Sequence, residues 1–113
     1  MERWNRARRD GPLTIRMEQA DDVLTVRAIG ELDRSNAETF ETELRLAISG
    51  DASTVVLDLG DARVIDSTGL RSVVRIANQS LRARARLRMR RPPPPIRRAL
   101  EGGGLEHLLP LVD

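Results

Sequence analysis

A nearly continuous apolar run, TVVLDL at residues 54–59, lies near the middle of the chain. It stands between two segments whose apolar residues recur at helical spacing. Such a run is typical of a central strand that is covered on both faces. Gly60 and Asp61, a pair common in turns, are expected to end it. The chain is therefore expected to fold as an α/β protein built around this strand.

Two weaker patterns precede the central run. Apolar and polar residues alternate over 13–17, which predicts a first strand. Residues 23–29 are rich in β-branched side chains and predict a second strand, paired with the first across a turn at 21–22. Residues 1–11 are charged and aperiodic, so we expect a mobile N-terminal tail followed by a folded domain over 12–113.

Two helices are predicted on either side of the central run. The first follows Ser35 and Glu38, which have the spacing of a capping box. Its expected apolar face consists of Ala37, Phe40, Leu44, Ala47 and Ile48. The second is expected to begin after Ser67, with that serine as its N-cap. Its expected apolar stripe consists of Leu70, Val73, Val74, Ala77 and Leu81.

The last third of the chain predicts shorter elements. Arginines alternate with small or apolar residues up to position 90, which predicts a strand over 85–90. Four prolines at 92–95 end it, and a short helix over 96–101 follows. Residues 111–112 are expected to form a last short strand. The order of elements predicts a single α/β domain in which a mixed sheet of four to five strands packs with helices.

Composition removes several classes of function. The chain has no cysteine, and its only histidine is His107, so thiolate sites and histidine-based catalysis lack their residues. The only aromatic residues are Trp4 and Phe40, which leaves no stacking platform for single-stranded nucleic acid. No apolar run approaches the roughly 20 residues that span a bilayer. We therefore expect neither an enzyme nor a membrane protein, and no cofactor.

All 19 basic residues are arginine, and eight of them lie between positions 82 and 98. Such a cluster could bind the phosphates of a nucleic acid. The simpler interpretation is an edge strand that its charges protect from pairing with other sheets. Because no aromatic residues interleave with the arginines and the net charge is only +2, we expect no specific nucleic-acid binding.

The residues that could carry chemistry lie where predicted strands pass into helices. Ser67, in the sequence DSTG, is expected at a helix N-terminus, a favourable position for a phosphate. The alternative is a plain cap that only satisfies free amides. Asp33, in the sequence GELD, could be a turn carboxylate. Glu31, Asp33 and Asp66 could together hold Mg²⁺, but nothing in their spacing requires a metal.

Four sequence blocks then resemble a known family, the STAS domain of bacterial anti-sigma factor antagonists. The blocks are GELD at 30–33, VVLDL at 55–59, DSTGL at 66–70 and PPPIRRAL at 93–100. They occur in the family's order and at similar spacing, and the resemblance covers about residues 13–112.

The resemblance implies a partner switch in the bacterial cytoplasm, of the kind used in stress responses. The chain would bind an anti-sigma factor that is also a serine kinase, and so free a sigma factor for transcription. The kinase would then phosphorylate Ser67 and release the chain, and a metal-dependent serine phosphatase would restore it. By the same resemblance, Asp33, Asp66, Thr68 and Gly69 belong to the partner-binding surface.

One alternative keeps the fold without the switch. In it the chain is a STAS-type scaffold, such as a subunit of a lipid transporter or of a stress-signalling assembly. The hydroxyl-bearing Ser67 at the family's phosphorylation position favours the antagonist.

Overall fold

The computed structural model describes residues 4–79, 86–104 and 109–113. Its strands form a single mixed sheet in the order β1-β2-β3-β4-β5-β6, which confirms the α/β class but has six strands where four to five were expected. The elements are β1 (Trp4–Asp10), β2 (Leu13–Ala20), β3 (Val23–Leu32), α1 (Ala37–Ser49), β4 (Thr54–Ile65), α2 (Ser67–Gln79), β5 (Leu87–Arg90), α4 (Pro94–Gly102) and β6 (Leu111–Val112).

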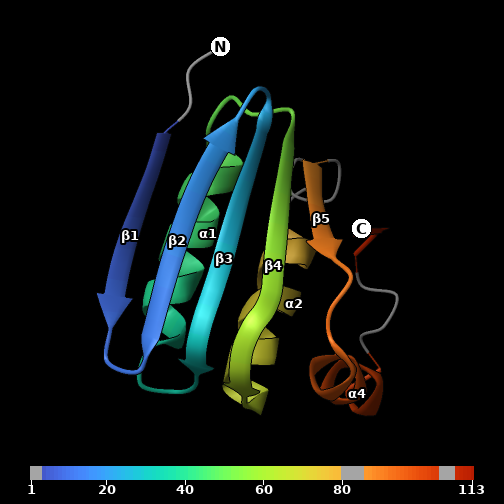
Figure 1. The fold of residues 1–113 in the computed structure, drawn as a ribbon. Helices are drawn as coiled ribbons and strands as arrows, with labels where there is room; N and C mark the ends of the chain where they lie inside the picture. The colour runs from blue at the N-terminus through green and yellow to red at the C-terminus, as the bar shows by residue number, and fades with distance from the viewer. Residues whose placement is uncertain (1–3, 80–85, 105–108) are drawn as a thin grey trace.

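The sheet changes from antiparallel to parallel at β3. Strands β1, β2 and β3 pair antiparallel, whereas β3, β4, β5 and β6 pair parallel. Helices α1 and α2 lie on the same side of the sheet, behind it in Figure 1. Each of these helices follows a parallel strand, α1 after β3 and α2 after β4, so both begin at the same edge of the sheet.

The expected mobile tail is wrong for the residues that form β1. This strand pairs with β2 along its whole length, from Trp4 opposite Gln19 to Asp10 opposite Leu13. Residues 5–9 are exposed, so the strand shows no alternation of buried and exposed side chains by which it could be recognised. Backbone pairing and contacts from its polar side chains to α1 hold it in place.

Strand β4 forms the centre of the sheet, as the apolar run predicted. All five residues from Val55 to Leu59 are buried, which confirms a strand covered on both faces. The predicted turn at Gly60 and Asp61 is wrong, because β4 continues to Ile65 through a register shift against β3. The Asp58 carboxylate accepts a hydrogen bond from the Gly60 amide at 2.8 Å, which stabilises the irregular stretch.

The arginine-rich strand β5 is not an edge strand, because it lies between β4 and β6. It begins at Leu87, and residues 81–85 of the predicted alternating pattern lie outside the described residues. Arg86 donates to three backbone carbonyl groups near the end of α1. Arg90 lies 3.2 Å from the buried Asp58 carboxylate. These arginines therefore have structural partners within the domain and are only partly directed to solvent.

The predicted helix faces agree with the packing. The expected face of α1 is buried throughout. On α2, Val73 and Ala77 are buried, Leu70 and Val74 are half-buried, and position 81 lies outside the described residues. Helix α4 begins two residues earlier than predicted, and β6 lies at the expected position. In the part of the chain that the structure describes, no helix has the length and apolar character needed to cross a membrane.

Candidate functional site

The candidate site lies where β3 and β4 end and α1 and α2 begin. Because the two strands are parallel and adjacent, their carboxyl ends meet at the same sheet edge, and so do the helix starts. Six residues from the two junctions line a shallow depression of about 480 Å³, namely Asp33, Arg34, Ser35, Asp66, Ser67 and Thr68. The structure thus brings together four of the five predicted site residues, and the fifth, Gly69, is buried beside them.

Asp66, and not Ser67, is the N-cap of α2. Its Oδ1 accepts a hydrogen bond from the Gly69 amide at 2.9 Å, and its carbonyl accepts one from the Leu70 amide at 3.1 Å. The predicted cap at Ser67 is therefore wrong by one residue. Strand β4 runs to Ile65, so the aspartate has to make the transition and Ser67 is already helical. The serine hydroxyl is consequently not occupied in capping.

The same aspartate joins the two junctions. Its Oδ2 accepts a hydrogen bond from the Arg34 amide at 3.2 Å, and its own amide donates to the Leu32 carbonyl at 3.2 Å. Both carboxylate oxygens of Asp66 thus bind backbone amides, one from each junction. The loop before α1 and the start of α2 are fixed to each other.

Asp33 forms the turn that leads into α1. Its Oδ1 accepts hydrogen bonds from the amide and the hydroxyl of Ser35, at 2.9 and 2.5 Å. Asn36 accepts from the Asp33 amide at 3.0 Å and donates to the Glu31 carbonyl at 2.9 Å. The predicted capping box of Ser35 and Glu38 is wrong, because Ser35 turns toward Asp33 and Asn36 occupies the N-cap position. A turn carboxylate, one of the two interpretations of Asp33, describes this geometry.

Ser67 presents its hydroxyl at the first position of α2. The residue is exposed, and Arg71 Nη2 donates to its Oγ at 3.4 Å. A helix N-terminus carries partial positive charge and free amides, so a negative group on this hydroxyl would be favoured there. The sequence interpretation missed Arg71, although its spacing of four residues from Ser67 places both on one helix face.

Thr68 and Gly69 differ from Ser67 in exposure. Thr68 is half-buried, and its carbonyl accepts a hydrogen bond from the Ser72 hydroxyl at 3.3 Å. Gly69 packs against the end of β3, where a Cβ would lie 2.8 Å from Leu32 Cγ. Gly69 therefore lets α2 approach the sheet closely. Of the adjacent hydroxyl groups of Ser67 and Thr68, that of Ser67 is the more accessible.

Metal binding gains no support from this arrangement. Among the described residues, no group of three or more histidine, aspartate or glutamate side chains could hold a metal ion. Glu31, Asp33 and Asp66 do not form such a group, and the last two already accept hydrogen bonds from neighbouring groups.

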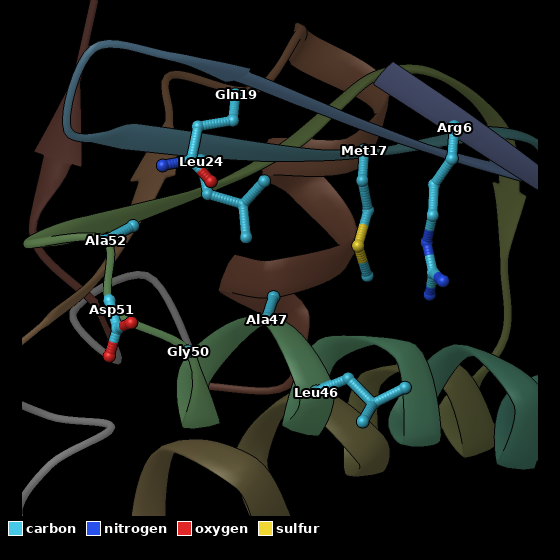
Figure 2. Close-up of a pocket in the computed structure, with 9 residues that line it drawn as sticks. All are labelled: Arg6, Met17, Gln19, Leu24, Leu46, Ala47, Gly50, Asp51 and Ala52. Atoms are coloured by element: carbon cyan, nitrogen blue, oxygen red, sulfur yellow. The ribbon is translucent and has the colours of Figure 1, made fainter. Parts of the chain in front are cut away.

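A second hollow of about 250 Å³ lies near the other end of α1. Figure 2 shows Met17 and Leu24 pointing from the sheet toward α1, with Ala47 facing them from the helix. Leu46 and Arg6 complete much of its border. Its lining is mostly apolar and contains no hydroxyl group. The depression at Ser67 therefore remains the better candidate for a regulated site.

Comparison with known proteins identifies related sequences and folds. The STAS domain family model matches residues 14–113. BtrV of Bordetella bronchiseptica, provisionally named an anti-sigma factor antagonist, is 30% identical over 101 residues, which are 89% of this chain and 87% of BtrV.

Solved structures share the fold at lower identity. An anti-sigma factor antagonist from Mycobacterium paratuberculosis superposes with a TM-score of 0.75 and 23% identity, over 88% of this chain and 84% of that one. Unphosphorylated SpoIIAA, also an anti-sigma factor antagonist, gives 0.70 and 21%, over 88% of each chain. The phosphorylated form of Bacillus SpoIIAA gives 0.64 and 21%, over 88% of this chain and 91% of that one.

Proposed function

Because the chain belongs to the STAS domain family, we propose that it acts as an anti-sigma factor antagonist in the bacterial cytoplasm. It is a binding protein and not an enzyme: it docks on an anti-sigma factor and thereby frees a sigma factor for transcription. The names of BtrV and of the solved relatives support this role. The depression that contains Asp33, Asp66 and Thr68 forms part of the docking surface.

The proposed switch is phosphorylation of Ser67 by an anti-sigma factor that is also a serine kinase. Ser67 Oγ attacks the γ-phosphorus of ATP, the bond from that phosphorus to ADP breaks, and the hydroxyl proton passes to a base of the kinase. A metal-dependent phosphatase later hydrolyses the phosphoserine with water and restores the hydroxyl. SpoIIAA, which shares the fold, has been solved in both unphosphorylated and phosphorylated forms.

The observation that carries this proposal is the exposed hydroxyl of Ser67 at the start of α2, free of any capping role. The fold can accept a phosphate there because the first turn of a helix favours negative charge. A docked partner cannot accept it as easily. Phosphoserine adds about −1.5 to −2 charge to a depression that already contains the carboxylates of Asp33 and Asp66. Phosphorylation therefore weakens the complex while the domain stays folded.

The test incubates the purified chain with a candidate anti-sigma factor kinase and ATP, followed by intact-mass measurement. The wild-type chain should gain one phosphate, Ser67→Ala none, and Thr68→Ala one, since Thr68 is the adjacent competing hydroxyl. Ser67→Ala should stay folded and bind the kinase in the presence of ATP, because no cap is lost.

Labelling of Ser67→Ala at the wild-type level would show that the phosphorylated residue is another one. If no variant is labelled and ATP does not affect binding, the chain is a non-switching STAS scaffold instead.

A further inference from the structure

The side chain of Arg71 is placed to respond to the modification of Ser67. It lies one helical turn after the serine, and its Nη2 donates to Ser67 Oγ at 3.4 Å. Arg71 is exposed, and within the described part of the chain it forms no ion pair with a carboxylate. The next arginine on the helix, Arg75, differs because it pairs with Glu41 at 2.9 Å. Arg71 is thus a cation held beside a neutral hydroxyl.

We propose that Arg71 is the intramolecular partner of the phosphate on Ser67. On phosphorylation its guanidinium exchanges the contact with the hydroxyl for an ion pair with the phosphate. The inference rests on the proposed phosphorylation of Ser67. The phosphoryl group brings three strong acceptor oxygens to an oxygen that the guanidinium already approaches, and pairs of guanidinium and phosphate are among the strong charge-assisted hydrogen bonds.

The other charges around the depression make Arg71 the best-placed cation. Asp33 and Asp66 are negative, and their carboxylates are engaged in hydrogen bonds that fix the loops. Arg34 also lines the depression, but the hydrogen bond that it donates to Asp66 comes from its backbone amide. Of these charged groups, only Arg71 has its own side chain in contact with Ser67 Oγ.

Phosphorylation with this pairing changes the charge of the surface in two ways. The phosphate adds negative charge, and the ion pair draws a positive group away from any docked partner. A carboxylate at position 67 has less charge and fewer acceptor oxygens than a phosphate. Ser67→Asp should therefore release the partner less completely than phosphorylation does.

The experiment places phosphoserine at position 67 by genetic incorporation, so that no kinase is needed. The second ionisation of the phosphate, near pH 6 for phosphoserine, is followed by ³¹P NMR in the otherwise wild-type protein and in Arg71→Gln. Because Arg71 stabilises the dianion, its removal should move the titration upward by about 0.5 pH unit. The difference should shrink in about 1 M salt, where charges are screened within about 3 Å.

Two matched variants serve as controls. Arg75→Gln removes the same charge from the same helix and should move the titration by less than about 0.1 pH unit. Arg34→Gln removes a charge from the same depression and should have a smaller effect than Arg71→Gln. Circular dichroism of each variant checks the fold, which the substitution of an exposed arginine should not change.

A titration of Arg71→Gln equal to that of the wild type would overturn the inference, as would an equal or larger shift in either control. The outcome is independent of the kinase test. If no kinase labels the chain, the proposed function is contradicted, but the ³¹P titration can still be measured. If the titration is unchanged, the inference about Arg71 is contradicted, but the result of the kinase assay is unaffected.

Discussion

The buried carboxylate of Glu43 on α1 forms ion pairs with arginines of β1. The contribution of these ion pairs to the free energy of unfolding can be measured. Its side chain is 3% exposed and pairs with Arg6 and Arg8 of β1, which are about half exposed. Replacing both arginines by alanine leaves a buried charge without its partners, a change that typically costs about 3–5 kcal/mol.

Fraying of β1 would let water reach Glu43 and lower that cost. We therefore expect the free energy of unfolding of Arg6→Ala/Arg8→Ala to fall by about 2–4 kcal/mol at pH 7.

Urea unfolding at pH 7 tests this expectation. Adding Glu43→Gln to the double variant should recover part of the stability at pH 7. Arg9→Ala is the matched control, since the exposed Arg9 donates a hydrogen bond to the Gly11 carbonyl and, among the described residues, pairs with no carboxylate. A double variant no less stable than Arg9→Ala would refute the reasoning, as would a loss of stability that Glu43→Gln does not reduce.

Two further substitutions test the site's construction by the same unfolding measurement. Asp66→Ala removes the cap of α2 and the acceptor for the Arg34 amide, so it should cost about 1–2 kcal/mol, clearly more than Ser67→Ala; equal losses would contradict the cap assignment. Gly69→Ala should cost about 1–3 kcal/mol from overpacking against Leu32, although alanine is the better helix former by about 1 kcal/mol. If Gly69→Ala is more stable than the wild type, the Leu32 side chain moves to make room for the added Cβ at little cost in free energy.

The parts of the fold that the sequence predicted are those with a strong hydrophobic pattern. The run at 54–59 is buried on both faces, and the expected apolar face of α1 is the buried one. Burial of apolar side chains leaves a period in the sequence, which is why these elements could be recognised. The candidate residues at 33 and 66–68 were grouped by the resemblance to the STAS family, and the structure places them together because the parallel strands β3 and β4 end at one edge of the sheet.

The parts that were missed depend on backbone pairing and on polar contacts. Strand β1 has exposed residues over 5–9, so nothing in its sequence distinguishes it from a mobile tail. Gly60 and Asp61 look like a turn, but neighbouring strands and the Asp58 carboxylate keep them in β4. The cap of α2 depended on where β4 ends, and Asp66 and Ser67 are equally good capping residues by type. Only the tertiary structure decides between them.

The two hydrogen bonds that the Asp66 carboxylate accepts, from the Gly69 and Arg34 amides, also reduce the conformational entropy that would be lost in the proposed recognition at this surface. Loops that must order on binding reduce affinity, because their lost freedom offsets part of the contact energy. Here both junctions are already ordered against each other before any partner arrives. Under the proposed docking, a partner of this depression meets a rigid template, and most of the free energy of its contacts remains available as affinity.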